Sequence, residues 1–256
     1  MSKKIQHIDL NSDLGEGFGA YRMGDDAAIM AIVSSANVAC GLHAGDPHIM
    51  VRSFAQARDL GVTVGAHPGY PDLWGFGRRD LAFSPAEIEH FVAYQIGAAL
   101  GASRLAGHPI RYVKPHGALA NTSHTNAVVA AAIVKAIKAI DPELVLLTFP
   151  DGEARRLAQE AGLATCAEIF ADRAYNADAT LVSRKLPGAV LHDVEFAAAR
   201  ALRMVAQGGI ETIEGTVVPM DIGSICVHGD SPDAIAMAKA VRTRLEGAGI
   251  SIKAFA

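Results

Sequence analysis

Acidic, imidazole and amine side chains recur at the ends of short apolar runs along this chain. Four of the ten histidines stand just after such runs, namely His43, His67, His116 and His228. Other runs are followed by Lys114 and by carboxylates, namely Asp13, Glu16, Glu168 and Asp172. Imidazoles and carboxylates move protons near neutral pH, and a lysine among them stabilises developing negative charge. Because gathering such groups costs desolvation energy, their convergence predicts a functional site.

Three of these histidines and one carboxylate also form a candidate metal site, with His43, His67, His116 and Asp13 as ligands. Nitrogen and oxygen ligands of this kind suit zinc, manganese or iron, and a bound ion turns water into a nucleophile at neutral pH. The same groups also suit a metal-free acid–base cluster that works through hydrogen bonds alone. No H-E-x-x-H motif decides between the two, so both interpretations stay open.

Some polar residues have a structural interpretation beside the functional one. Asp46 and Asp230 stand shortly before a proline at a predicted helix start, where a carboxylate caps the helix. Loop 69–79 is rich in glycine and aromatic residues, and it holds the only tryptophan and two arginines. Such a loop either closes over a carboxylate ligand or packs its own aromatic side chains against the surface.

Common nucleotide-binding signatures are missing or out of place. Residues 15–20 match G-x-G-x-x-A, but the first glycine does not come directly off an apolar strand and no helix opens within the run. The dipeptide Gly-Lys does not occur, which excludes a G-x-x-x-x-G-K-[ST] phosphate loop, and no G-x-S-x-G nucleophile elbow occurs. If ATP is used, another chain or an unusual site must bind it.

Short apolar runs alternate with longer amphipathic ones, which is typical of βα units and of a parallel sheet or barrel. We predict strands over 7–10, 36–39, 62–66, 111–114, 144–149, 166–170, 225–227 and 250–254. We predict helices over 25–33, 47–60, 85–105, 126–140, 152–161, 194–207 and 232–246, and a small β-hairpin within 209–223. The loops after the strands of a βα barrel meet at one mouth, so the polar groups above are expected to share it.

The bulk composition favours one barrel domain over residues 1–256, because about half of the chain is hydrophobic and a sizeable core can form. With 23 basic and 27 acidic side chains the net charge is −4, which argues against nucleic acid and against a polybasic membrane anchor. No apolar run approaches the ~20 residues that a membrane helix needs. Cys40, Cys166 and Cys226 lie far apart, which favours a reducing compartment and predicts a cytoplasmic protein.

Several sequence blocks together resemble the LamB/YcsF family. They are 9–16 (DLNSDLGE), 37–47 (NVACGLHAGDP), 65–72 (GAHPGYPD), 113–119 (VKPHGAL) and 170–175 (FADRAY). With 227–230 (VHGD), the resemblance runs through nearly the whole chain. It implies an α/β fold, namely a distorted, roughly seven-stranded βα barrel akin to glycoside hydrolases and carbohydrate deacetylases.

The family includes the A subunit of the bacterial ATP-dependent 5-oxoprolinase, which opens the lactam of 5-oxo-L-proline to L-glutamate together with subunits B and C. The resemblance therefore implies 5-oxoproline as the substrate, those subunits as partners, and ATP as a cofactor held by the partners. It also implies site residues at Asp13, His43, His67, Lys114, His116 and Glu168. One departure is Ala179, which stands where the family pattern leads us to expect glycine. If that turn needs a positive φ, alanine costs about 1 kcal/mol there.

Two other functions stay open on the sequence. The barrel and its histidines also suit a stand-alone, metal-dependent deacetylase or sugar hydrolase, which would turn over without ATP. The chain could instead be a non-catalytic metabolite-binding or regulatory subunit. Replacing Asp13 and His67 would then leave the activity of the complex unchanged.

Overall fold

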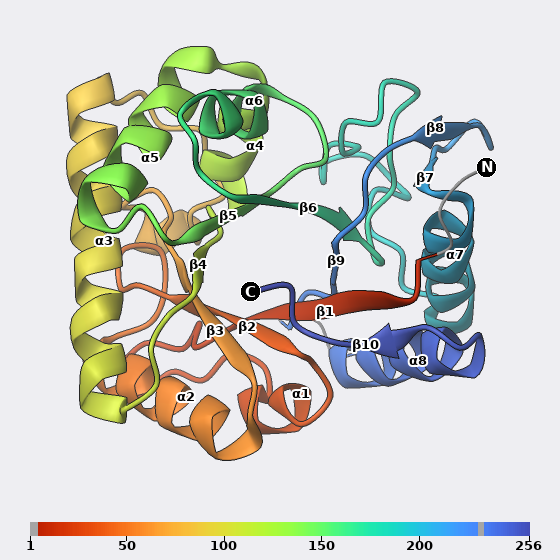
Figure 1. Ribbon diagram of the computed structural model, residues 1–256, viewed down its shortest axis with the longest axis horizontal. Coiled ribbons are helices and arrows are strands. Elements are labelled where there is room, and N and C mark those ends of the chain that lie inside the picture. Colours follow the sequence, from red (N-terminus) through yellow and green to blue (C-terminus); the bar gives the residue numbers. More distant parts are fainter. Residues whose placement is uncertain (1–4, 230–232) are drawn as a thin grey trace.

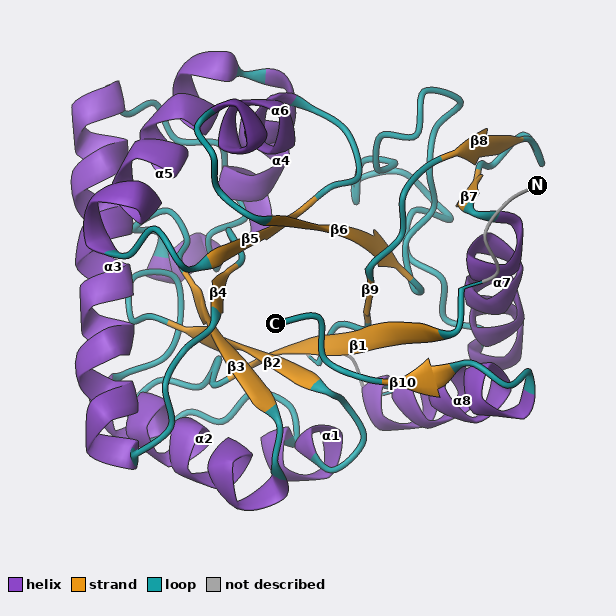
Figure 2. Ribbon diagram, in the orientation of Figure 1, coloured by secondary structure: helices purple, strands orange, loops and turns teal. Residues whose placement is uncertain are grey.

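Seven parallel strands close into a barrel in the computed structural model, which describes residues 5–229 and 233–256 (Figures 1 and 2). The strands are β1 (His7–Leu14), β2 (Ser35–Ala39), β3 (Thr63–His67), β4 (Tyr112–Val113), β5 (Val145–Thr148), β6 (Thr165–Phe170) and β9 (Ser224–Cys226). Each pairs with its neighbour in this order, and β9 closes the ring by pairing with both β6 and β1. The predicted distorted, seven-stranded βα barrel is confirmed.

Three short strands lie outside the ring. Strand β10 (Ser251–Ile252) pairs with the start of β1, where His7 faces Ser251. Strands β7 (Gly209–Glu211) and β8 (Val217–Pro219) form the antiparallel hairpin that the sequence predicts within 209–223.

Helices surround the outside of the barrel, as Figure 1 shows. They are α1 (Asp26–Met30), α2 (Pro47–Leu60), α3 (Pro85–Ala106), α4 (Gly117–Thr125), α5 (Ala127–Ile140), α6 (Glu153–Glu160), α7 (Val194–Gln207) and α8 (Ala234–Gly247). Side chains cap five of these helices, namely α1, α2, α3, α5 and α7. Ser84 and Glu87 form a capping box at α3, and Asp46 caps α2 by accepting a hydrogen bond from Ile49 N at 2.8 Å. Within the described residues, no helix is long and apolar enough to span a membrane.

Two differences from the predicted elements affect the site. Strand β1 runs to Leu14 rather than Leu10, so Asn11 and Asp13 lie inside a strand instead of in a loop after it. Helix α4, which directly follows β4, was not predicted, because it is short and half of it is polar. Its start places His116 at the N-terminal cap position, with its backbone extended.

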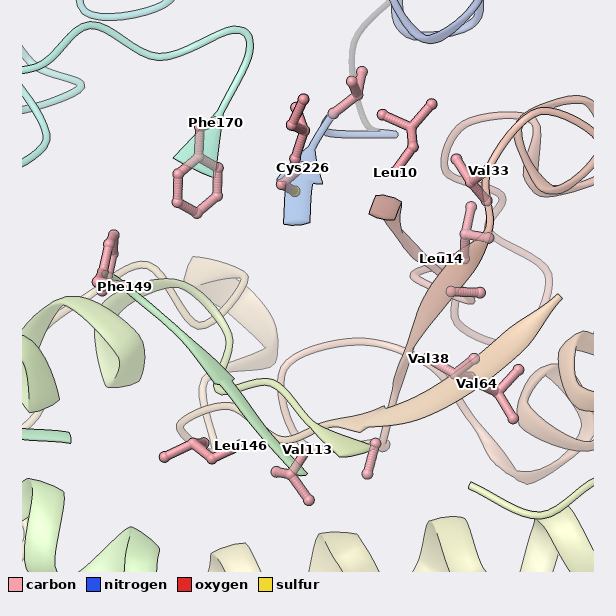
Figure 3. Close-up of a cluster of buried hydrophobic side chains, with 14 of the residues drawn as sticks. Leu10, Leu14, Val33, Val38, Val64, Val113, Leu146, Phe149, Phe170 and Cys226 are labelled. Carbon is pink, nitrogen blue, oxygen red and sulfur yellow. The ribbon is translucent and has the colours of Figure 1, made fainter. Parts of the chain in front are cut away.

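Side chains alternate strictly across the barrel wall, because successive residues of a strand point to opposite faces. The outward residues are mostly apolar and pack under the helices. Figure 3 shows Val38, Val64, Val113 and Leu146 on this outer side. The inward residues are mostly polar, and their hydrogen bonds run across the barrel. At the end away from the strand tips, Phe255 contacts the ring of Tyr112 with centroids 4.9 Å apart. The interior is therefore a polar network closed at one end.

Ala179 has φ +65°, so the turn where the family pattern favours glycine does need the left-handed region. The expected strain is present in this chain, since a Cβ atom is crowded in that conformation.

Candidate functional site

A cavity of about 520 Å³ opens at the C-terminal ends of the barrel strands. Its wall includes five of the six side chains that the resemblance marks as site residues, together with His228: Asp13, His67, Lys114, His116, Glu168 and His228. His43, the remaining one, does not line the cavity but stacks behind His116, with ring centroids 3.9 Å apart. The tertiary structure thus gathers groups that are up to 215 positions apart in the sequence.

Lys114 lies at the centre of the floor of this cavity. Its Nζ is 2.9 Å from Asp13 Oδ1 and 2.9 Å from Glu168 Oε1, and it donates to Cys226 Sγ at 3.1 Å. All of these side chains are buried. Asn11 Oδ1 lies farther away at 3.3 Å, so the three protons of the ammonium group are shared among four partners. The weak thiol contact is the one that a ligand oxygen can replace at least cost.

Neutral amides hold the two carboxylates in place. Asn11 Nδ2 donates to Glu168 Oε1 at 2.8 Å, and Asn37 Nδ2 donates to Asp13 Oδ1 at 2.8 Å. Tyr112 in turn donates its hydroxyl to Asn37 Oδ1 at 2.7 Å. Sequence reasoning missed Asn37 and Tyr112 as parts of the site. The available signal was a polar or bulky residue at the inward positions of predicted strands.

The two carboxylates have pKa values shifted in opposite directions. Burial would raise the pKa of Asp13, but His67 and Lys114 outweigh it and hold that pKa well below its ordinary value. Burial raises the pKa of Glu168, and Lys114 offsets only part of the effect. Burial also disfavours the ammonium form of Lys114, yet Asp13 and Glu168 keep its pKa well above the ordinary range. When the pKa values of two neighbouring carboxyl groups are shifted apart, one commonly acts as the base and the other as the acid.

A second cluster joins three imidazoles to one carboxylate beside this floor. One donor atom from each of Glu16, His43, His67 and His116 lies within 4.8 Å of all the others. Burial and the neighbouring imidazoles hold the pKa values of His43 and His116 well below their ordinary value, so both rings are uncharged near neutral pH. Among the described residues, His43 makes no hydrogen bond through either ring nitrogen.

The loop after β3 packs its backbone directly on these rings. A Cβ atom at Gly69 would lie 2.6 Å from His43 Nδ1, and one at Gly77 would lie 2.8 Å from both His43 Cβ and His116 Cδ2. Gly77 also has φ +62°. Glycine is therefore required at both positions for the loop to approach the imidazoles this closely. The same loop carries Trp74 at its tip, where the side chain is 97% exposed.

His228 and Asp172 form a third unit on the wall of the cavity. His228 Nδ1 lies 2.7 Å from Asp172 Oδ2, while Arg184 donates to His228 Nε2 at 3.2 Å. Since an arginine can only donate, Nε2 carries the lone pair and Nδ1 carries the hydrogen. Burial would raise the pKa of Asp172, but His228 holds it below the ordinary value. This arrangement orients an imidazole base toward the cavity.

The charges around the cavity favour an anionic ligand. Two carboxylates line it, against five basic side chains: Arg78, Lys114, Arg173, Arg184 and Lys185. They are not equivalent. Arg173 is buried and donates to the backbone oxygens of Ala189 and Val182, so it holds the loop after β6 in shape.

The other residues singled out by the sequence fall into structural residues and residues that line the cavity. Asp46 is a helix cap, as described for α2, and it also accepts from Gly19 N at 2.8 Å. Of the two arginines in loop 69–79, Arg78 lines the cavity, whereas Arg79 is ion-paired with Asp72. Asp230 lies outside the described residues.

Comparisons with known proteins agree with this geometry. The LamB/YcsF family model matches residues 8–256. The 5-oxoprolinase A subunit from Gluconobacter oxydans (strain 621H) is 55% identical over 247 residues, which is 96% of this chain and 97% of that protein. The crystal structure of a lactam utilization protein from Thermus thermophilus superposes with a TM-score of 0.92 at 44% identity, and covers 97% of this chain and 100% of its own.

More distant structures share the fold alone. A T48 deacetylase superposes with a TM-score of 0.51 at 15% identity, over 97% of this chain and 87% of its own. The full-length family match and the high identity of the relatives carry more weight than this likeness. Together they show that the chain belongs to the LamB/YcsF family.

Proposed function

We propose that this chain is the A subunit of an ATP-dependent 5-oxoprolinase, which opens 5-oxo-L-proline to L-glutamate together with subunits B and C. Relatives that carry this name match nearly the full chain at 55% identity. The observation that supports a catalytic role is the buried Lys114 ammonium, held between Asp13 and Glu168 on the floor of the cavity. Buried charged groups in a cleft are costly, and active sites are where they collect.

The ligand chemistry fits this substrate. At neutral pH 5-oxoproline carries one carboxylate and one amide in a five-membered ring. The excess of basic groups around the cavity suits the carboxylate, and Arg78 and Arg184 are the arginines proposed to bind it. Lys114 would exchange its contact with the Cys226 sulfur for one with the lactam carbonyl oxygen, and would stabilise the negative charge that develops there.

The proton transfers are assigned to two groups in the cavity. Water adds to the lactam carbonyl carbon once Arg184 has moved from His228 Nε2 to the substrate carboxylate; His228 then accepts the proton of the water at Nε2 while Asp172 holds the ring in place. The ring C–N bond then breaks, and Glu168 takes up a proton and passes it to the departing nitrogen; burial raises the pKa of Glu168, which favours that uptake. Asp13 stays ionised and keeps Lys114 charged. His43, His67 and His116 complete the proposed site residues beside this group.

The use of ATP is assigned to subunits B and C, because this chain lacks a phosphate-binding loop. Transfer of a phosphoryl group from ATP to the lactam oxygen, with release of ADP, would activate the ring carbon toward water, since a phosphorylated oxygen withdraws the electrons that stabilise an amide. Addition of water and cleavage of the C–N bond would then leave an acyl phosphate, which a second water hydrolyses to L-glutamate and inorganic phosphate. We place the reaction in the cytoplasm, because Cys40, Cys166 and Cys226 are free, buried thiols, which suits a reducing compartment.

The test is glutamate production from 5-oxoproline by the reconstituted A, B and C subunits with ATP. His228→Gln and Glu168→Gln are each expected to lower kcat by about 100-fold or more, the usual contribution of a positioned acid or base. Lys135→Gln is the control, because this exposed lysine pairs with Glu89 on the outer helices. It is expected to leave turnover unchanged.

Two results would overturn the proposal. Wild-type glutamate production by both His228→Gln and Glu168→Gln would show that this chain only binds metabolites or regulates the complex. Hydrolysis of an N-acetyl substrate by the chain alone, without ATP and without lactam opening by the complex, would show that it is a deacetylase.

A further inference from the structure

The imidazole rings of His67 and His116, next to Lys114 on the floor of the cavity, are each fixed by a backbone carbonyl oxygen. His67 Nδ1 lies 2.7 Å from the backbone oxygen of Lys114, and His116 Nε2 lies 2.8 Å from that of Phe76. A carbonyl oxygen only accepts, so each of these nitrogens carries the hydrogen of its ring. The other two nitrogens, His67 Nε2 and His116 Nδ1, then face each other with their lone pairs at 3.0 Å. Such a contact needs either one added proton or a metal ion between the two rings.

The separation of these nitrogens, 3.0 Å, lies near the value for shared coordination of one ion and is about 0.3 Å shorter, so the rings would part slightly around the ion. With Zn–N bonds of 2.0–2.1 Å and tetrahedral angles, two ligating nitrogens lie roughly 3.3–3.4 Å apart. Histidines that bind metals also commonly donate their second ring hydrogen to a backbone carbonyl, which fixes the tautomer and points the free nitrogen at the ion. Both features are present at His67 and His116.

Two further donors complete the group. His43 stacks on His116 and is fully buried, yet neither of its ring nitrogens makes a hydrogen bond within the described structure. An imidazole that loses all its hydrogen bonds to water without a replacement is destabilised by about 1–3 kcal/mol. A ligated metal ion would supply the missing partner. Glu16 Oε1 lies 3.9 Å from His116 Nδ1. The carboxylates of Asp13 and Glu168, by contrast, are ion-paired with Lys114.

We propose that Glu16, His43, His67 and His116 bind one divalent transition-metal ion of the zinc class. Three nitrogens and one oxygen suit zinc, whereas magnesium and calcium prefer oxygen ligands. Asp13 Oδ1 lies 3.4 Å from His67 Nε2 but accepts from Lys114 and Asn37, and Glu16 rather than Asp13 lies within reach of all three imidazoles. The ion would lie against the wall of the cavity formed by His67 and His116, where it would add positive charge beside the Lys114 floor. This inference does not depend on the lactam reaction.

The test is metal binding by the full chain alone, without partner subunits, ATP or lactam. After chelator treatment, the wild type is titrated with Zn²⁺ against a chromogenic chelator, and with Co²⁺ by visible absorption. We expect one ion per chain. His67→Gln is expected to lower zinc affinity by more than about 100-fold, since partners outside the coordination shell alone contribute 10–100-fold. Glu16→Gln is expected to lower it measurably.

His124→Gln is the matched control, because this histidine lines the same cavity but is not part of the group, and it should bind zinc like the wild type. X-ray absorption of the zinc-loaded wild type should count three imidazole ligands, which keeps the test decisive if a variant fails to fold. Thermal unfolding of the wild type, but not of His67→Gln, should shift upward with zinc.

Three results would overturn the metal site. They are substoichiometric binding by the wild type, fewer than two imidazoles in the absorption spectrum, and loss of the ion in Asp13→Asn with retention in Glu16→Gln. The first would mean that a shared proton holds the two imidazoles together. Absence of zinc with full glutamate production by the complex would refute this inference and leave the proposed function intact. Bound zinc without lactam opening by the complex would support the metal site and refute the proposed function.

Discussion

Replacing Lys114 by methionine tests how much the buried ammonium group contributes to the stability of the fold. The side chain keeps similar length and volume but loses its ammonium group. Each of its two ion pairs has a separation of 2.9 Å. At an effective dielectric constant of about 20, such a pair contributes ~6 kcal/mol before desolvation is counted. Returning the ammonium to water recovers several kcal/mol, so breaking a buried pair of this kind typically costs about 3–5 kcal/mol.

The loss of stability in Lys114→Met should depend on pH in a definite direction. In the wild type the pKa of Asp13 is depressed, so its contribution to stability is present above the unfolded pKa and is lost as pH falls. Without the ammonium, burial would raise the pKa of Glu168 further above its unfolded value, and it would raise the pKa of Asp13 against the remaining effect of His67. The folded variant then retains protons that the unfolded chain releases, so it becomes less stable as pH rises. The difference from wild type should therefore be largest near neutral pH and should narrow toward about pH 4–5.

Urea unfolding of both proteins at several pH values measures this difference directly. The double variant Lys114→Met/Glu168→Gln should recover part of the lost stability, because it removes one of the two stranded carboxylates. Lys135→Met serves as the surface control, with an expected loss below about 1 kcal/mol. A loss below about 1 kcal/mol in Lys114→Met, constant across this pH range, would refute the reasoning. It would mean that the ammonium does not compensate the buried carboxylates.

Three further changes test other parts of the structure. Asp172→Asn should lower kcat of the reconstituted complex far more than it changes KM, because the amide no longer holds the base tautomer of His228; equal changes in both would contradict a positioning role. Ala179→Gly should raise stability by up to about 1 kcal/mol in urea unfolding, because φ +65° strains alanine; a loss of stability would show that the buried methyl group matters more. Gly77→Ala should destabilise the chain by more than about 1 kcal/mol, because φ is +62° and the new methyl group would collide with His43; an unchanged unfolding midpoint would contradict this.

Local sequence signals predicted most of the elements correctly. Apolar runs with a period of two and amphipathic runs with caps are determined by neighbours in the chain, and helices such as Pro47–Leu60 and Val194–Gln207 match their predicted bounds. Helix α4 was missed for the same reason, since it is short and weakly amphipathic and gains its stability from packing against α5 and α6. The extension of β1 to Leu14 was missed because its inward residues are polar, which resembles a loop when only the sequence is seen.

The sequence by itself determined which residue types reach the C-terminal mouth of the barrel, because every parallel strand ends there. It did not determine how those residues divide into groups. Only the closed barrel, with β9 joining β1, brings both Asp13 and Glu168 within 2.9 Å of Lys114 Nζ, and places Glu16 within reach of all three imidazoles. That division depends on distances of a few ångströms between residues far apart in the chain, and such distances are set by the strand order, the register and the packing of the finished fold.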